Sequence, residues 1–219
     1  MSAVTLTIDG REVRAKAGEK LLWAALDAGI AIANLCAVRG VTPPHGGCRL
    51  CWVRIEGTPR PVASCARAVA DGMVVATRSP EVDRLVRSAF ELLLSVHRLN
   101  CRECPGNRRC ALQEIARTRR SPLTGKRFPK IEPLVAIDES RAEIGFDASH
   151  CVQCGRCVRV CNDVVRKGVL DHARRGLSTV VSTFDGRPLA EQECGDCVAC
   201  AEVCPVGAIY PRRPPADQP

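Results

Sequence analysis

The chain has 219 residues and includes 15 cysteines, but its aromatic residues are only two Trp, one Tyr and four Phe. This length allows several modest domains, none of which needs a large core, and the scarcity of aromatic side chains leaves hydrophobic burial poorly supplied for three separate folds. No run of about 18 apolar residues occurs, so we expect no membrane span. The N-terminus MSAVTLTIDG lacks the basic and apolar segments of a signal peptide. Together with an odd cysteine count, this disfavours a secreted disulfide scaffold and predicts a cytoplasmic location.

The first 78 residues predict a small mixed domain. Residues 4–17 read VTLTIDGREVRAKA, two alternating segments on either side of Asp9-Gly10, which is a strong hairpin signal. Residues 19–29, EKLLWAALDAG, place leucine and alanine at helical spacing, with Trp23 as a core residue and Gly29 at the end. Strands are expected again at 51–57, 61–65 and 73–78. A hairpin, a crossing helix and further strands around a cysteine loop describe a β-grasp domain like that of plant-type ferredoxins.

Two helices and a linker are predicted next. Ser79-Pro80-Glu81 combines a capping side chain, a proline at the first helical position and an acid in the first turn. The apolar spacing of VDRLVRSAFELLLSVH continues this helix and places His97 in its last turn. A second short helix, CALQEIARTRR, begins at Cys110. Residues 119–133 are rich in proline and basic side chains and predict an extended linker, and residues 213–219 have the composition of a disordered tail.

The cysteines form four groups, and a histidine completes the group that has only three. The groups are Cys36, Cys48, Cys51 and Cys65; His97, Cys101, Cys104 and Cys110; Cys151, Cys154, Cys157 and Cys161; and Cys194, Cys197, Cys200 and Cys204. These sixteen residues suffice for four metal sites and leave no cysteine over. The dense C-x2-C repeats fit thiolate ligation better than disulfides.

The last two groups are C-x2-C-x2-C-x3-C runs, and Pro205 follows the second. This is the bacterial ferredoxin signature for cubane [4Fe-4S] clusters, in which the fourth cysteine of each run binds the other cluster. We therefore assign one cluster to Cys151, Cys154, Cys157 and Cys204, and its partner to Cys161, Cys194, Cys197 and Cys200.

The first group supplies one C-x2-C pair and two single cysteines, which suits a flat [2Fe-2S] cluster better than a cube. Its first loop is longer than the C-x4-C-x2-C of plant ferredoxins. Gly46 and Gly47, just before Cys48, allow the backbone to approach the bridging sulfides closely. A structural zinc site is the alternative for this group.

His97 requires a separate argument, because a histidine near a helix end is usually a surface or capping residue. Here Cys101, Cys104 and Cys110 form a site that lacks one ligand, and the other histidines, His45, His150 and His172, are distant in sequence. We therefore predict a [4Fe-4S] cluster bound by His97 and the three cysteines. An imidazole in place of a thiolate removes one negative charge and is expected to raise the reduction potential.

The formal net charge of +8 is largely offset once the thiolates bind clusters. Three centres at about −2 and one at about −1 leave the loaded protein near +1 by roughly counting deprotonated ligands. Basic residues gather around the histidine-containing site, either as a solvated face or as a docking surface for an acidic partner. They are Arg98, Arg102, Arg108, Arg109, Arg117, Arg119, Arg120, Lys126, Arg127 and Lys130.

The order of these motifs resembles the N-terminal iron-sulfur region of the large iron-sulfur subunit of respiratory complex I, of NAD-dependent formate dehydrogenases and of iron-only hydrogenases. The H-x3-C-x2-C-x5-C element is highly specific to this group, and the resemblance covers roughly residues 1–212. It implies an α+β fold in three parts. These are a [2Fe-2S] β-grasp domain at 1–78, a helical [4Fe-4S] segment at 79–120 and a two-cluster ferredoxin-like domain at 141–212. A basic linker at 121–140 and the tail at 213–219 complete the chain.

These relatives continue into large catalytic domains, whereas only a short proline-rich tail follows Tyr210 here. A chain of this size resembles the small iron-sulfur subunit of the diaphorase part of soluble NAD-reducing, bidirectional nickel-iron hydrogenases. The resemblance implies a non-catalytic subunit that relays electrons between a flavin- and NAD(H)-binding diaphorase subunit and a hydrogenase module. The cofactors expected are one [2Fe-2S] and three [4Fe-4S] clusters. No GxGxxG fingerprint is present, and we expect no flavin or NAD on this chain itself.

Three other functions stay open. The same relay role fits an NAD-linked formate dehydrogenase or a complex I-like assembly. A freely diffusing polyferredoxin also fits the cluster content, although the arginine-rich stretch favours a stable partner. A zinc-binding nucleic-acid module is suggested by the C-x2-C repeats and a pI of about 8.9, but the ferredoxin spacing argues against it, and we expect no nucleic-acid partner.

Overall fold

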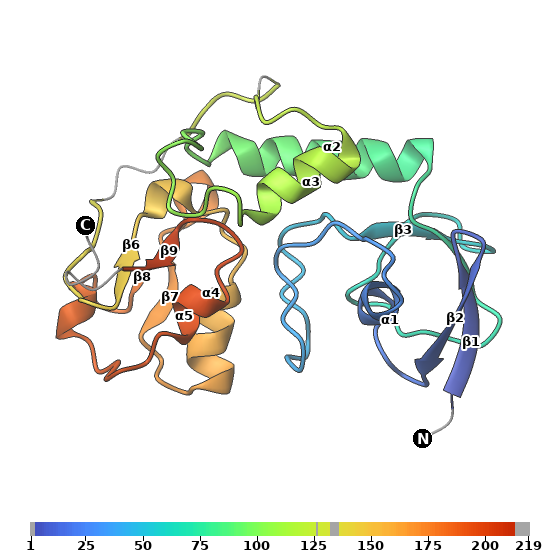
Figure 1. The fold of residues 1–219 in the computed structure, drawn as a ribbon, viewed down its shortest axis with the longest axis horizontal. Coiled ribbons are helices and arrows are strands. Elements are labelled where there is room, and N and C mark those ends of the chain that lie inside the picture. The colour runs from blue at the N-terminus through green and yellow to red at the C-terminus, as the bar shows by residue number, and fades with distance from the viewer. Residues whose placement is uncertain (1–2, 126, 132–135, 213–219) are drawn as a thin grey trace. The chain divides into compact units, whose positions relative to one another are not determined.

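The computed structural model describes residues 3–125, 127–131 and 136–212. The chain divides into two compact units, Met1–Phe90 and Glu91–Pro219, and each is a mixture of helices and strands (Figure 1). The domain boundaries expected from the sequence stay predictions. The expected tail at 213–219 lies outside the described residues.

The first unit is built on a five-stranded mixed sheet with the order β2-β1-β5-β3-β4. Its strands are β1 (Ala3–Ile8), β2 (Arg11–Lys16), β3 (Trp52–Ile55), β4 (Val62–Ala63) and β5 (Val74–Ala76). β1 and β2 form the hairpin expected around Asp9-Gly10, where both turn residues have positive φ. β5 then pairs parallel with β1 and antiparallel with β3. The strands predicted at three separate segments are therefore confirmed and join one sheet.

Helix α1 (Leu21–Asp27) supplies the other half of this unit's core. Its Leu21 and Leu22 are fully buried, as are Ile8 and Val53 of the sheet. Each such side chain stabilises the fold by about 1.5–3 kcal/mol relative to an exposed one. Trp23 is only partly buried and packs against this core, with the Arg39 guanidinium 4.7 Å from its ring centroid. The first unit therefore has a continuous hydrophobic core of its own.

Helix α2 (Pro80–Ser95) begins where the sequence predicts, because the Ser79 Oγ accepts a hydrogen bond of 3.2 Å from the Val82 N–H. It ends two residues before His97, so the expectation that His97 lies in its last turn is wrong. The carbonyls at this end have other partners. Lys130 Nζ donates to the carbonyls of Leu94 (2.6 Å) and His97 (3.2 Å), and the Ile131 N–H donates to Ser95 (2.8 Å). These bonds from the predicted linker satisfy carbonyls at the end of the helix, and His97 lies beyond it.

The second unit consists of short elements. After α3 (Ala111–Arg119), the strands β6 (Ile144–Phe146) and β9 (Ile209–Pro211) form one antiparallel pair, and β7 (Leu170–Ala173) and β8 (Val180–Thr183) form another. Helix α4 (Arg156–Arg159) continues into a π-helical turn, η2 (Val160–Val164), and α5 is Ala199–Glu202. The described part of this unit also contains the 3-10 turns η1 (Ala148–His150), η3 (Gly176–Ser178) and η4 (Leu189–Glu191). Such short elements cannot form a large core, so the loops that carry cysteines occupy much of this unit.

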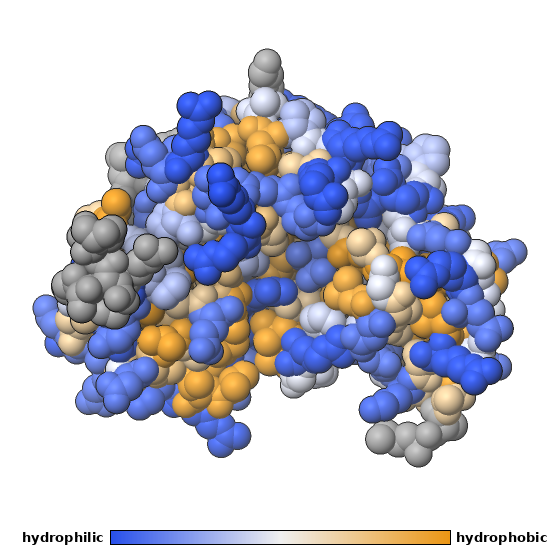
Figure 2. Space-filling view, in the orientation of Figure 1, coloured by the Kyte–Doolittle hydropathy of each residue, from blue (hydrophilic) through white to orange (hydrophobic). Residues whose placement is uncertain are grey.

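The surface is mixed in character. In the face shown in Figure 2 hydrophilic side chains predominate, while hydrophobic atoms are exposed over the region of α4 and α5. Among the described residues, no helix combines the length and apolar character needed to cross a lipid bilayer.

Candidate iron-sulfur sites

The first predicted site lies wholly within the first unit. Cys36 follows α1, Cys48 and Cys51 precede β3, and Cys65 follows β4, and all four are buried. Hydrogen bonds join the thiols of Cys36 and Cys48, and those of Cys51 and Cys65. Each bond lowers the pKa of one partner, Cys36 or Cys51, and raises that of the other. All four thiols therefore interact in a single buried cluster.

Both positions before Cys48 favour glycine, but at Gly47 the reason is a neighbouring side chain that the sequence did not indicate. Gly46 has φ +70°, which favours glycine. A Cβ on Gly47 would lie 2.8 Å from the His45 ring, so this glycine makes room for an imidazole next to the cysteines.

The second predicted site contains a buried histidine with an unpaired ring nitrogen. His97 is 4% exposed, and its Nδ1 has no hydrogen-bond partner. Burial, aided by the neighbouring His150, lowers the His97 pKa to about 4, so the ring is neutral near pH 7. A neutral imidazole with a free nitrogen is the form that binds metals.

Cys101, Cys104 and Cys110, the other three residues of this predicted site, lie on the turns that lead into α3. Cys110 is the residue directly before that helix. Burial raises the pKa of Cys104 and of Cys110, and the three cysteines interact electrostatically. The three thiols that the sequence groups together are therefore neighbours in the fold.

Three contacts hold the His97 segment against the ferredoxin-like segment. The Arg98 N–H donates to the Ser149 carbonyl (2.8 Å), and the Ala111 N–H donates to the Pro205 carbonyl (2.8 Å). Between them the backbones at Gly106 and Gly207 meet so closely that neither position has room for a Cβ. Every one of these residues is within three positions of a predicted ligand, so the contacts fix ligands of two sites relative to one another.

The third predicted site is the first of the two crosswise sites, and the structure brings its four cysteines together. Cys151, Cys154, Cys157 and Cys204 line one cavity, whose other walls are mainly apolar and include Phe146. Cys204 interacts electrostatically with both Cys151 and Cys157. An apolar cavity lined by four thiols suits a cubane cluster.

Backbone amides already face the sulfurs of this third site. Cys151 Sγ accepts a hydrogen bond from the Gln153 N–H (3.3 Å), and Cys204 Sγ accepts one from the Ile209 N–H (3.4 Å). The loop can turn around a central group because Gly155 has φ +71°. Hydrogen bonds to ligand sulfurs are among the factors that set cluster potentials.

The fourth predicted site pairs Cys161 with the last cysteine run. Cys194 and Cys200 each interact electrostatically with both Cys161 and Cys197. Cys161 Sγ accepts a hydrogen bond from the Val169 N–H (3.3 Å), and burial raises the Cys200 pKa to about 11. The crosswise pairing therefore matches the neighbours of Cys161 as well as those of Cys204.

Sequence reasoning missed one neighbour of the second site. His150 is distant from His97 in sequence, yet its ring packs edge-on against His97 with centroids 5.8 Å apart. Asp147 Oδ2 lies 2.9 Å from its Nδ1, and Asn100 Oδ1 lies 2.5 Å from its Nε2. No local pattern signals this contact, which depends on the packing of 97–100 against 147–150.

The sixteen residues fit iron-sulfur clusters by the chemistry of their donors. All fifteen cysteines are free thiols, and the described residues contain no group of three or more His, Cys, Asp or Glu positioned around a single metal ion. The ligands of a cluster are distributed over two or four iron atoms, so they surround a larger volume than the ligands of one ion. The assignment of individual ligands stays a prediction.

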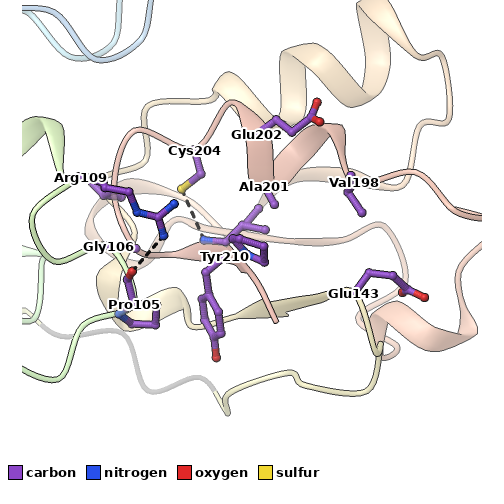
Figure 3. A pocket seen from close by; sticks show the side chains of 13 residues that line it. Pro105, Gly106, Arg109, Glu143, Val198, Ala201, Glu202, Cys204 and Tyr210 are labelled. Carbon is purple, nitrogen blue, oxygen red and sulfur yellow. Dashed lines mark hydrogen bonds between the residues drawn. The ribbon is translucent and has the colours of Figure 1, made fainter. Parts of the chain in front are cut away.

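A second cavity, of about 490 Å³, lies beside the third site (Figure 3). Arg109, Glu202 and Tyr210 contribute to its walls, and the Arg109 guanidinium reaches the Pro105 carbonyl at 3.5 Å. Cys204 lines both this cavity and the one formed by the four cysteines. Only this ligand of the third site borders the larger cavity.

Two family models match the chain. Residues 1–80 match a 2Fe-2S iron-sulfur cluster binding domain, and residues 142–210 match the ferredoxin-like domain of NADH-quinone oxidoreductase subunit 3. A subunit of NADH-quinone oxidoreductase from Rhizobium meliloti is 34% identical over 96% of this chain and 24% of its own length. A chain in the crystal structure of an NAD+-reducing [NiFe]-hydrogenase superposes with a TM-score of 0.84, at 30% identity, over 100% of this chain and 91% of its own length. The chain belongs to the family of iron-sulfur subunits that includes those of NADH-quinone oxidoreductase.

Other members of this iron-sulfur subunit family are named for different activities. NADP-reducing hydrogenase subunit HndD of Solidesulfovibrio fructosivorans is 35% identical over 95% of this chain and 36% of its own length. The alpha subunit of NADPH-Fe(3+) oxidoreductase of Geobacter sulfurreducens is 34% identical over 94% of this chain. The chain spans about a quarter of the length of the first curated relatives that it matches. Family membership and the expected ferredoxin-type domains are therefore confirmed, whereas substrates and partners differ among the relatives.

Proposed function

We propose that this chain is the iron-sulfur relay subunit of an NAD-reducing hydrogenase. It carries electrons between a flavin- and NAD(H)-binding diaphorase subunit and a hydrogenase module. The observation that carries this proposal is the match to a chain of the NAD+-reducing [NiFe]-hydrogenase over 91% of that chain's length. The curated relatives support the broader role, because their names are those of NADH- or NADPH-linked oxidoreductases and hydrogenases.

The cofactors in this proposal are one [2Fe-2S] and three [4Fe-4S] clusters, bound by the sixteen predicted ligands. The first group of cysteines binds the [2Fe-2S] cluster in a β-grasp domain, and the remaining three groups bind as assigned from the sequence. When bound, such clusters accept and donate single electrons. The protein contributes thiolates, one neutral imidazole, backbone N–H donors to sulfur and apolar walls that exclude water.

A complex I-like assembly is the second candidate, and the identity to the NADH-quinone oxidoreductase of Rhizobium meliloti favours it. The relay chemistry would be the same in a formate dehydrogenase. In each case the final donor or acceptor belongs to a partner, so measurements on the assembled complex discriminate between these roles.

The test is affinity purification of the native complex through a tag on this chain, followed by metal, sulfide, flavin and subunit analysis. Nickel and flavin in stoichiometric amounts would support the hydrogenase assignment. Molybdenum or tungsten would instead support a formate dehydrogenase, and a quinone-reactive membrane complex would support the complex I-like role. A cluster-loaded monomer without partners would indicate a free polyferredoxin. Zinc without iron or sulfide would overturn the proposal altogether.

A further inference from the structure

Arg141 is a buried cation that none of the predicted sites includes. Its side chain is 7% exposed, although it precedes β6 in an otherwise irregular segment. Two of its donors bind the loop of the last cysteine run: Nη2 donates to the Gly195 carbonyl (2.7 Å) and Nη1 to the Cys197 carbonyl (3.2 Å). The guanidinium therefore binds the loop that carries two predicted ligands of the fourth site.

The loop that Arg141 binds also carries Cys194, the ligand directly before Gly195. Burial raises the pKa of the Cys194 thiol, while the positive charge of Arg141 acts in the opposite direction. Both observations place a positive charge next to the fourth site.

The ion pair that Arg141 makes does not account for its burial. Its Nε and Nη2 donate to Glu143 Oε2 at 3.2 and 3.0 Å, but the Glu143 side chain is 48% exposed. Water therefore screens that carboxylate on its outer side. The other two acceptors are neutral carbonyls, and a buried cation needs opposite charge nearby. A cluster with four thiolate ligands supplies about two negative charges at this position.

We propose that Arg141 raises the reduction potential of the cluster bound by Cys161, Cys194, Cys197 and Cys200. Reduction adds one electron and hence one negative charge to that cluster. The buried guanidinium stabilises the reduced state more than the oxidised state, because its attraction grows with the cluster's charge. Arg141 is thus a tuning residue that acts through its charge, which its hydrogen bonds to the Gly195 and Cys197 carbonyls hold next to the cluster. This inference rests on the ligand assignment of the proposed function.

A structural role alone makes a different prediction. If Arg141 only holds the 194–197 loop in place, Arg141→Lys and Arg141→Gln should change the reduction potential of the cluster equally, because both lose the forked hydrogen bonds. If its charge sets the potential, Arg141→Lys stays nearer to wild type. Glu143→Gln then shifts the potential in the opposite direction, because it removes the opposing negative charge and keeps the bonds to the loop.

The experiment is a dithionite redox titration of the purified, cluster-loaded complex, followed by electron paramagnetic resonance. The signal of the fourth site is identified by its loss in Cys200→Ala. We expect Arg141→Gln to lower the equilibrium constant for one-electron reduction of that cluster about tenfold. This corresponds to a decrease of about 59 mV in its reduction potential. Arg187→Gln is the matched control, because Arg187 is an exposed arginine that pairs with Asp185, and it should leave the potential unchanged.

The outcomes separate this inference from the proposed function. An unchanged potential in fully loaded Arg141→Gln, or equal shifts in Arg141→Lys and Arg141→Gln, would overturn the tuning role. If Arg141→Gln loses the cluster, Glu143→Gln decides: a raised potential supports the role and an unchanged one refutes it. If wild type itself lacks iron and sulfide at this site, or Cys200→Ala loses no signal, the ligand assignment fails instead.

Discussion

Gly106 and Gly207 meet backbone to backbone within the second unit. A Cβ on Gly106 would lie 2.6 Å from the Gly207 nitrogen, and one on Gly207 would lie 2.4 Å from Cys104 Sγ. Real Cβ atoms do not approach other heavy atoms so closely, so either substitution forces the two segments apart. Cys104 belongs to the predicted second site, and Cys204, a ligand of the third, is three residues before Gly207. The contact therefore fixes two predicted sites relative to each other.

Gly207→Ala should displace Cys104 and empty the second site. The expected iron content falls from about fourteen to about ten per chain, since one [4Fe-4S] cluster is lost. The control is Gly57→Ala, where φ is +76° but nothing lies within 4 Å of the added Cβ. That variant carries backbone strain of about 1 kcal/mol without a clash and should keep all its iron. Full iron in Gly207→Ala would contradict the close approach.

Local rules predicted the first unit well. Asp9-Gly10 sets the hairpin through positive φ at both positions, and Ser79 starts α2 with a side-chain hydrogen bond. Both features depend on residues that are neighbours in sequence. The predicted ligand groups rest on the same kind of signal, because C-x2-C spacing is a local constraint.

What the sequence could not reveal depends on contacts between distant segments. α2 ends at Ser95, where Lys130 and Ile131 bind carbonyls of its last turn, although the apolar spacing continues beyond. His150 reaches His97, and Arg141 reaches the 194–197 loop, only after the chain has folded.

Lys126, one of the predicted basic residues, lies outside the described residues. Arg117 and Arg127 of the same group form ion pairs with Glu114 and Glu91, so part of that charge is paired.

His97→Ala should remove one cluster, whereas His97→Cys should retain it at a lower potential. The alanine leaves three ligands, and the cysteine replaces a neutral imidazole with a thiolate that adds one negative charge. Iron analysis and a redox titration of both variants check these outcomes. His172→Ala is the control, since His172 is a histidine of the same unit that lies in β7 and belongs to no predicted site. An unchanged iron count and spectrum in His97→Ala would exclude this ligand.

Removing iron should unfold the part of the chain around residues 141–210 before the first unit. The first unit has a continuous core that includes Leu6, Ile8, Leu21 and Leu22, all of them almost fully buried. Buried residues of 141–210 include several predicted ligands, among them Cys154, Cys157 and Cys161. Metal binding therefore contributes a larger share of the folding free energy there.

Hydrogen exchange before and after chelation of iron measures this difference. Amides of β7, β8 and α4 should lose protection first, while those of β1 and β2 should keep it until further denaturant is added. Protection that persists at 141–210 in the iron-free protein would show that this segment folds without clusters.

Tyr210 should ionise well above its ordinary range. Burial, together with a hydrogen bond that the hydroxyl donates to Glu139 Oε1 (2.8 Å), raises its pKa to about 12. The unfolded chain loses this proton near pH 10 and the folded chain near pH 12. Between these values the folded state binds more protons, so the free energy of unfolding falls as the pH rises from about 10 to 12. Below pH 10 this contribution is fully present.

Because Tyr210 is the single tyrosine in the sequence, ultraviolet absorbance of tyrosinate reports on it alone. The folded protein should show a midpoint near 12, and the urea-unfolded protein one near 10. Glu139→Gln should lower the folded midpoint, because it removes the negative charge that disfavours tyrosinate. In Tyr210→Phe, the loss of stability between pH 10 and 12 should be smaller than in wild type. A folded midpoint equal to the unfolded one would show that neither burial nor Glu139 acts on this hydroxyl.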